Sequence, residues 1–249
     1  LTVVQSLSLP NLYSSKMFNF IPWPYLMIMK TMVNCFKGLR SLDMRKCYNE
    51  TLRDDPRILE VFKMQLDWKN HIKKLEELRI GKNDKNYYGY GSFGLLIDAD
   101  TVINIASKFR ELKVLDLCKI FDLTDAALIA IAENCKRLES LNVNGSETIT
   151  DMGAIEVVKN CPLKYIDFSL CINLTNKLLN VIAKECPGLK CILLHACHRA
   201  RDEGVINIAK KCSFLEEIDL RSCVELSDKS IIAIANNCSN LRSFAFFSN

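Results

Sequence analysis

The chain has 249 residues, 49% of them hydrophobic and 25% charged, and a formal net charge of +4 at pH 7. Acidic and basic residues are interleaved, so the basic stripe that binds a phosphate backbone is missing and we expect no nucleic acid partner. No secretory signal opens the chain, and the most apolar stretch, residues 17–33, is too short and interrupted to span a bilayer, so we expect no membrane partner.

Residues 1–108 carry a short motif, apolar-x-x-apolar-x-apolar, whose copies are followed by the next one after 35, 36 and 37 residues. The three copies are Val4-Leu7-Leu9, Leu39-Leu42-Met44 and Leu75-Leu78-Ile80. Each copy predicts a strand. The segments between them predict helices, one near Pro24, which suits a first helical turn, and one from Asp55 through Leu66. We therefore predict irregular, longer repeats with insertions over residues 1–108.

The third insertion, residues 82–94, combines glycines with four aromatic residues, Tyr87, Tyr88, Tyr90 and Phe93. Long insertions in compact folds are usually functional or disordered. We predict that these side chains form a flexible partner-binding element. The alternative is that the rings pack locally or fold over the rim of the repeats.

Residues 109–249 repeat the same motif six times at a nearly constant spacing. The first leucines of the copies lie 26, 25, 26, 26 and 26 residues apart, at Leu112, Leu138, Leu163, Leu189, Leu215 and Leu241. This period and pattern are those of leucine-rich repeats. We predict that residues 1–249 form a single α/β leucine-rich repeat solenoid. It would be a curved horseshoe with about nine parallel strands on the concave face and helices on the convex face.

Each regular motif is followed by a helical pattern that opens with a characteristic pair of residues. The pairs are Thr124-Asp125, Thr150-Asp151, Thr175-Asn176, Arg201-Asp202 and Ser227-Asp228. The hydroxyl is predicted to cap the helix, and the acidic residue to complement the helix dipole. Because Arg201 has no hydroxyl, we expect Asp202 to cap its helix alone.

Ten of the twelve cysteines occupy two recurrent positions of the repeat. Those before the motif are Cys35, Cys135, Cys161, Cys186, Cys212 and Cys238, and those after it are Cys47, Cys171, Cys197 and Cys223. Free cysteine behaves as a small buried hydrophobe, so these positions predict packing. Such thiol-rich usage fits a reducing compartment, and we expect the chain in the cytoplasm, the nucleus or both.

The residues give little support to a metal site or to an enzymatic function. Cys191, His195, Cys197 and His198 could suggest zinc, but strand alternation puts Cys197 and His195 on opposite faces, and Cys191 and His195 lie about 13 Å apart. We expect no metal and no cofactor. The three histidines of the chain are accompanied by no phosphate loop or nucleophile elbow, so we expect no catalytic residues and no enzyme.

The residues that flank the apolar positions of each motif are predicted to point to the concave side. Four of them depart from the repeat average, and Tyr and Arg are the types enriched at interface hot spots: Tyr165, His195, Arg221 and Phe247. We predict that a target protein binds there, with Asn144, Asp167 and Asp219 as neighbouring contacts. The aspartates at 43, 116, 167 and 219 form a column that is either a cation- or lysine-recognition track or a structural feature of the repeat.

The period, the cysteines and the Thr-Asp helix starts resemble the cysteine-containing leucine-rich repeats best known from F-box/LRR proteins, the substrate receptors of SCF ubiquitin ligases. The likeness is carried by residues 112–118 with Leu123-Thr-Asp125 and Cys135, and by residues 215–223 with Leu226-Ser-Asp228 and Cys238. It covers residues 109–249. It implies a non-catalytic module that holds a target protein for ubiquitin transfer, with a Skp adaptor and a cullin attached through an F-box.

No segment of this chain is long and helical enough to be an F-box. The alternative function is that of a stand-alone leucine-rich repeat scaffold or regulator. The chain opens within a repeat strand and stops after Phe246 and Phe247 without a polar capping segment. Solenoids usually have atypical terminal units, so we expect a fragment of a longer protein, with which an upstream F-box is compatible.

Overall fold

The computed structural model describes residues 6–8, 38–43, 45, 74–81 and 97–247. Nine short strands form one parallel sheet in sequence order. They are β1 (Ser6–Ser8), β2 (Ser41–Asp43), β3 (Glu77–Arg79), β4 (Val114–Asp116), β5 (Ser140–Asn142), β6 (Tyr165–Asp167), β7 (Cys191–Leu193), β8 (Glu217–Asp219) and β9 (Ser243–Ala245). The helices in this part of the chain are α3 (Ala99–Lys108), α4 (Asp125–Asn134), α5 (Asp151–Asn160), α6 (Asn176–Glu185), α7 (Asp202–Lys211) and α8 (Asp228–Asn237).

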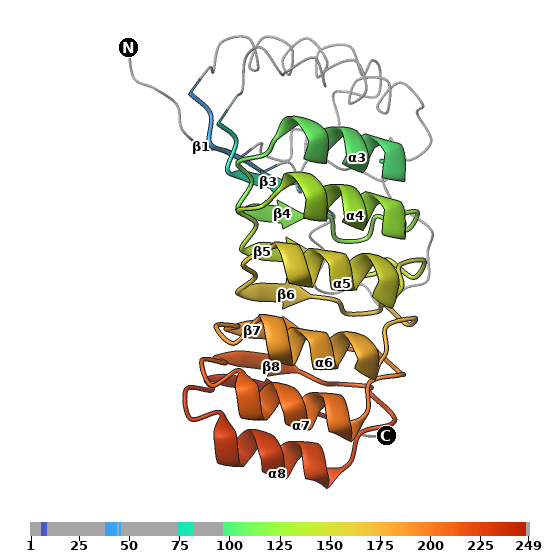
Figure 1. Ribbon diagram of the computed structural model, residues 1–249, viewed down its shortest axis with the longest axis vertical. Coiled ribbons are helices and arrows are strands. Elements are labelled where there is room, and N and C mark those ends of the chain that lie inside the picture. Colours follow the sequence, from blue (N-terminus) through green and yellow to red (C-terminus); the bar gives the residue numbers. More distant parts are fainter. Residues whose placement is uncertain (1–5, 9–37, 44, 46–73, 82–96, 248–249) are drawn as a thin grey trace, which may run out of the picture.

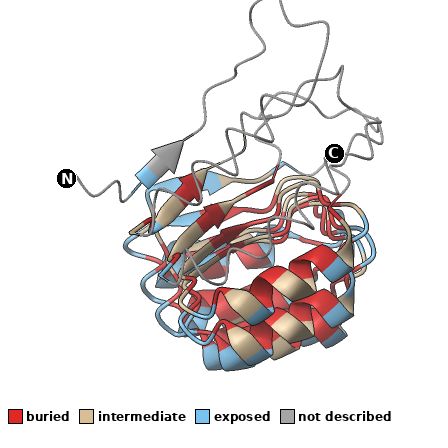
Figure 2. Cartoon of the chain, turned by 90° about the horizontal axis from the view of Figure 1, so that it is seen from above, coloured by how far each residue is buried: buried red, intermediate tan, exposed pale blue. Residues whose placement is uncertain are grey.

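Figure 1 shows the coils stacked along the long axis of the molecule, with the strands on one side and the helices on the other. Seen from above in Figure 2, the buried residues lie between these two layers. The motif explains this core, because Leu112, Leu115 and Leu117 are each 0% exposed and so all three apolar positions face the interior. The prediction of an α/β leucine-rich repeat solenoid is confirmed.

Hydroxyl side chains cap three of the four helices for which the sequence predicted it. The exception is α4, whose N-cap Thr124 makes no side-chain cap bond. Thr150, Thr175 and Ser227 accept hydrogen bonds from the backbone N–H two residues later. The expectation for Asp202 is wrong, because the N-cap of α7 is Arg201, without a side-chain cap bond, and the Asp202 carboxylate faces the next coil. Within the described residues, no helix is long and apolar enough to cross a membrane.

The cysteines of the described coils are free thiols, and most of them are buried. At the helix ends the thiols donate to a carbonyl of the preceding coil, as from Cys212 to the Cys186 oxygen at 3.3 Å. Past the strands, Cys223 donates to Leu194 at 3.0 Å and Cys197 to Phe168 at 3.2 Å. Cysteine therefore fills two positions where a small side chain is buried against the backbone of the previous coil. Cys35 and Cys47 lie outside the described residues.

Candidate functional site

One face of the sheet points away from the helices, and we call it the sheet face. In β4 to β8 the middle residue of each strand is buried, so its neighbours on either side line the sheet face. The strand register aligns these neighbours in two rows, and backbone hydrogen bonds just past the strands align a third. Row 1 contains Ser41, Glu77, Val114, Ser140, Tyr165, Cys191, Glu217 and Ser243. Row 3 contains Asp43, Arg79, Asp116, Asn142, Asp167, Leu193, Asp219 and Ala245. Row 5, just past the strands, contains Arg45, Gly81, Cys118, Asn144, Ser169, His195, Arg221 and Phe247.

The acidic and amide residues of row 3 hold the ends of their strands. In five coils their side-chain oxygen accepts a hydrogen bond at 3.0 Å from the backbone N–H two residues later: Asp43, Asp116, Asn142, Asp167 and Asp219. This is an Asx-turn, in which the side chain imitates a backbone turn. Within the described part of the chain, no group of three or more His, Cys, Asp or Glu is placed to hold a metal ion. These contacts favour the structural interpretation of the aspartate column.

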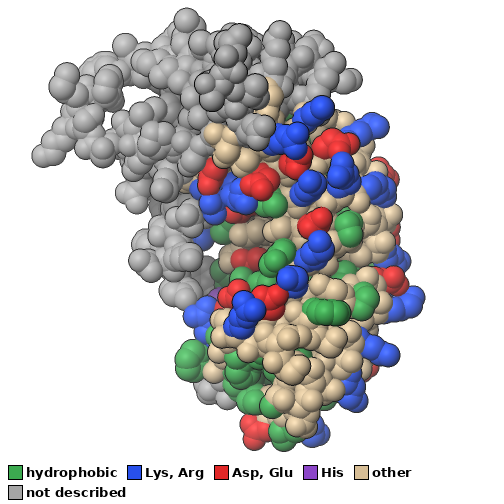
Figure 3. All heavy atoms as spheres, turned by 90° about the vertical axis from the view of Figure 1, so that its left-hand side faces the viewer, with side chains coloured by type: hydrophobic (Ala, Val, Ile, Leu, Met, Phe, Trp, Pro, Cys, Tyr) green, Lys and Arg blue, Asp and Glu red, His purple; other side chains and the backbone are tan. Residues whose placement is uncertain are grey.

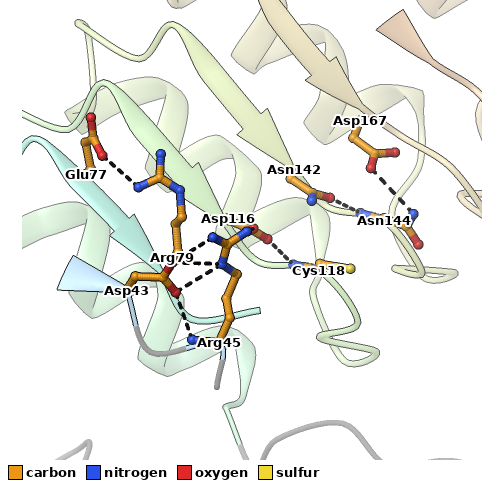
Figure 4. Close-up of polar contacts among 9 residues, drawn as sticks. All are labelled: Asp43, Arg45, Glu77, Arg79, Asp116, Cys118, Asn142, Asn144 and Asp167. Atoms are coloured by element: carbon orange, nitrogen blue, oxygen red, sulfur yellow. Dashed lines mark hydrogen bonds and ion pairs between the residues drawn. The ribbon is translucent and has the colours of Figure 1, made fainter. Parts of the chain in front are cut away.

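The N-terminal part of the sheet face is charged and internally paired, as Figure 4 shows. Arg45 forms a two-pronged ion pair with Asp43, with its closest approach at 2.6 Å. Arg79 contacts Glu77, also at 2.6 Å. The hydrogen bond from Arg79 lowers the pKa of Glu77 despite its partial burial. A guanidinium or carboxylate of a partner would have to compete with these pairs.

The middle of the sheet face contains carboxylates with weaker partners. Burial raises the pKa of Asp116 and of Asp167 above the usual aspartate value. The nearest cation of Asp116 is Arg45 at 3.5 Å, and Asp167 accepts a long contact of 3.5 Å from the Asn144 amide. The Asn144 side-chain oxygen is itself buried and has no hydrogen-bond partner in the described structure.

Close packing shapes the same region at Gly81. A Cβ atom there would lie 2.2 Å from the Cys118 backbone nitrogen and 2.7 Å from a carboxylate oxygen of Asp116. No side chain fits at this position of row 5. Glycine therefore lets the β3 coil approach the turn of the β4 coil, which positions Asp116 on the sheet face.

The residues predicted to bind a partner divide into two places. His195, Arg221 and Phe247 are neighbours in row 5, and the His195 ring nitrogen Nδ1 lies 3.1 Å from the Arg221 carbonyl oxygen. Arg221 also pairs with Asp219 at 2.6 Å. Tyr165 is 44% exposed but belongs to row 1, which lies about 13 Å away at the other end of the strands. The four residues therefore do not form one group.

Other candidates from the sequence have different surroundings. Asn144 and Asp167 contact each other in the middle of the sheet face. Of the residues considered for zinc, Cys197 is buried against Phe168, Cys191 contacts Glu217 at 3.6 Å, and His198 lies 3.0 Å from the Ser222 carbonyl oxygen. The predicted loop contacts Tyr87, Tyr88, Tyr90 and Phe93 lie outside the described residues.

A row of charged residues of both signs lies where the strands begin, and the sequence analysis did not identify it. We call it the charged edge: Arg40, Glu76, Lys113, Glu139, Lys164, Lys190, Glu216 and Arg242. Its ion pairs join neighbouring coils, for example Lys113 with Glu76 at 2.7 Å and Lys190 with Glu216 at 2.9 Å. Figure 3, which looks onto this side, shows blue and red side chains next to one another, whereas hydrophobic side chains are more frequent toward the C-terminal coils. Such pairing is typical of a solvated surface.

The chain is similar in sequence to several known proteins. The chain is 27% identical over 168 residues, 66% of its length, to the antagonist of mitotic exit network protein 1 of Candida glabrata. It is 32% identical over 105 residues, 39% of its length, to GRR1-like protein 1 of Arabidopsis thaliana. The matched segments cover only 28% and 17% of these two relatives. No protein-family model matches the chain.

Among solved structures, the fold is similar to the crystal structure of the Rad7 and Elc1 complex in yeast, with a TM-score of 0.59 and 17% sequence identity. The superposition covers 90% of this chain and 73% of that one. At this identity the likeness establishes the fold alone. Taken with the repeat motifs and the sequence relatives, the chain is a cysteine-containing leucine-rich repeat solenoid whose repeats resemble those of F-box/LRR proteins.

Proposed function

We propose that the chain is a non-catalytic protein-interaction module that recognises a target protein for an SCF-type ubiquitin ligase. The observation that carries this proposal is the sheet face. Its three rows run across consecutive coils with varied side chains, while the apolar motif positions beneath them are nearly uniform. A surface whose residues vary on a constant frame suits recognition of another polypeptide, because the frame fixes their positions.

The ligase part of the proposal is supported by the resemblance of the repeats to F-box/LRR proteins. In such an arrangement a Skp adaptor and a cullin would attach through an F-box elsewhere in the full-length protein. The solenoid would hold the target protein in place, and other subunits would carry out the chemistry of ubiquitin transfer. The second candidate function is a stand-alone scaffold or regulator, which the sheet face supports equally well and the sequence relatives support less.

The two functions differ in what the full-length gene product binds. We expect the tagged full-length protein to co-purify with a Skp adaptor and a cullin, and residues 1–249 expressed alone to bind neither. In the same cells, depletion of the full-length protein should lengthen the half-life of at least one protein that cross-links to the sheet face. If the full-length protein binds neither subunit, the scaffold function replaces the ligase function.

The cellular location is part of the same proposal. Within the described residues all ten cysteines are free thiols, although they lie in adjacent coils. Reduced thiols in such number suit the cytoplasm or nucleus, where glutathione and thioredoxin keep them reduced. Imaging of the full-length protein fused to a fluorescent protein tests this location, and a signal confined to the secretory pathway would contradict it.

A further inference from the structure

Leu193 interrupts the polar side chains of row 3 on the sheet face. By register it lies between Asp167 of β6 and Asp219 of β8. Both aspartates accept the hydrogen bond that closes an Asx-turn, a contact that contributes about 0.5–1.5 kcal/mol. Leucine has no acceptor and cannot form it. The coil of β7 thus lacks a local stabilising contact and presents a half-buried apolar side chain on the sheet face instead.

Two further apolar side chains adjoin Leu193. Cys191 precedes it in the same strand on the same face, and Tyr165 is the register partner of Cys191 in β6. With strands about 4.8 Å apart and a rise of about 3.3 Å per residue, the Cα atoms of Tyr165 and Leu193 are about 8 Å apart, within reach of a tyrosine side chain. We call Tyr165, Cys191 and Leu193 the Leu193 patch. Its tyrosine is 44% exposed, so the patch is open to a partner.

Carboxylates stand on both sides of the Leu193 patch. Asp167 lies beside Leu193, and the exposed Glu217 lies beside Cys191. Neither forms an ion pair with another described residue. Glu217 accepts from the Cys191 thiol, and Asp167 accepts from Ser169 and Asn144. Asp219, in contrast, is neutralised by Arg221 at 2.6 Å. The patch therefore combines an apolar centre with two negative charges that a cation can approach.

Resting on the proposed function, we propose that the Leu193 patch binds an extended segment of the target protein in which an apolar side chain lies within two residues of a Lys or Arg. The apolar side chain packs on Leu193 and Tyr165. The neighbouring cation reaches Asp167 or Glu217. The spacing fits, because one to two residues of extended chain span about 3–7 Å and adjacent strands are about 4.8 Å apart.

Selection from a random peptide library displayed on phage tests this inference with the purified chain. The wild-type protein should enrich peptides that pair an apolar residue with a nearby Lys or Arg. A synthetic peptide of the enriched sequence, labelled for fluorescence anisotropy, then gives the affinity. Enrichment of acidic peptides, or of no common pattern, would overturn the inference.

The structure offers a matched pair of variants. Leu193→Asp supplies the acceptor that closes the Asx-turn in β6 and β8, and this bond acts against the repulsion between the new carboxylate and Asp167 and Asp219. Urea unfolding of the variant checks that the fold is retained. Its affinity for the enriched peptide should fall about tenfold or more. Ala245→Asp makes the same kind of change in the same row of β9, two strands away, and should leave the affinity within about twofold. Equal binding by wild type and Leu193→Asp would sink the proposal, as would equal losses in both variants.

Charge recognition has its own variant. Glu217→Lys reverses one of the two flanking charges, and its selection should shift toward peptides with an Asp or Glu beside the apolar residue. An unchanged preference for Lys and Arg would remove Glu217 from the site. Adaptor binding by the full-length protein separates this inference from the ligase function: both Leu193→Asp and wild type should retain it. Loss of adaptor binding with peptide selection intact would refute the ligase and leave the patch as the binding site of a scaffold.

Discussion

Asp151, the first residue of α5, accepts hydrogen bonds from both the backbone N–H and the hydroxyl of Thr175, the N-cap of α6, at 2.8 and 2.5 Å. The same contact joins Asp125 to Thr150 and Asp202 to Ser227. The acidic residue of each pair thus satisfies polar groups at the start of the following helix. Helix starts are therefore linked from coil to coil, in addition to the ladder of the sheet.

We predict that Asp202→Ala destabilises the solenoid by about 1–3 kcal/mol, because it removes three hydrogen bonds to Ser227 and Ser230. Urea unfolding followed by circular dichroism measures the change in midpoint. The control is Asp228→Ala, at the same place in α8, where the carboxylate makes no hydrogen bond to another described residue. Asp228→Ala removes the same favourable interaction with a helix dipole, but it leaves the hydrogen bonds between α7 and α8 in place. Equal destabilisation by the two variants would refute the link.

These links also define a pH dependence. Despite some burial, the hydrogen bonds from Ser227 and Ser230 lower the pKa of Asp202. A carboxylate with a lowered folded-state pKa contributes stability that is present above its unfolded value of about 4 and is lost as the pH falls through the folded value. We expect the stability difference between wild type and Asp202→Ala to shrink as the pH is lowered from about 6 to about 2. Urea midpoints across this range test it, and a constant difference would show that the charge is irrelevant.

Asp167 should behave in the opposite way. Burial raises its pKa above the unfolded value, so its ionised form costs stability above the folded-state pKa, and that cost disappears as the pH falls. Asn142 makes the same Asx-turn one strand away with an amide. We predict that Asp167→Asn is more stable than wild type near pH 7 and equal to it near pH 3, by urea unfolding at both pH values. A less stable variant at neutral pH would mean that the charge itself is required.

Particular residues show how much of the fold could be predicted from the sequence. The leucine period placed the buried middle residues of β4 to β8, because a buried motif repeated about every 26 residues packs coil upon coil. Three of the four hydroxyl caps were also predictable, because Thr and Ser at helix starts act locally. The role of Asp202 was not, since its partners Ser227 and Ser230 lie 25 and 28 residues away and become neighbours only when the coils stack.

The candidate site was predicted only in part. Position within the repeat put Tyr165, His195 and Arg221 on the sheet face, but unusual residue type alone did not show that Tyr165 belongs to a different row from the other two. Leu193 was predicted to face the concave side but was not singled out as a contact, because a leucine in a leucine-rich motif does not stand out by residue type. Its meaning emerged only from the register, which sets it between two aspartates that both close a turn.

The buried thiols should resist alkylation in the folded protein. Burial raises the pKa of Cys212, Cys223 and Cys135 to about 12, so at pH 8 almost none of each is thiolate, the reactive form. We predict that iodoacetamide labels these cysteines at least a hundredfold more slowly in the native protein than in urea, as measured by mass spectrometry of the peptides. Replacing Cys35 and Cys47 with Ser removes the two thiols that lie outside the described residues, so that the labelling reports on the described cysteines. Fast native labelling of Cys212 would contradict the packing.

Glu216 holds together three coils along the charged edge, with Lys190 at 2.9 Å on one side and Arg242 at 3.8 Å on the other. The hydrogen bond from Lys190 lowers the pKa of this glutamate, so it remains charged well below neutral pH. Glu216→Lys would leave four consecutive coils with a positive charge on this edge, at positions 164, 190, 216 and 242. Because these side chains are exposed, salt screens them, and we expect a loss of stability at low ionic strength that largely disappears at about 1 M NaCl, where the screening length is about 3 Å.

Thermal unfolding at both salt concentrations measures this loss of stability. Glu133→Lys, on the exposed side of α4 and without an ion pair to another described residue, is the control and should change stability little at either. A loss for Glu216→Lys that salt does not relieve would mean that the glutamate acts through packing, and the ion pairs along the edge would then have no part in joining the coils.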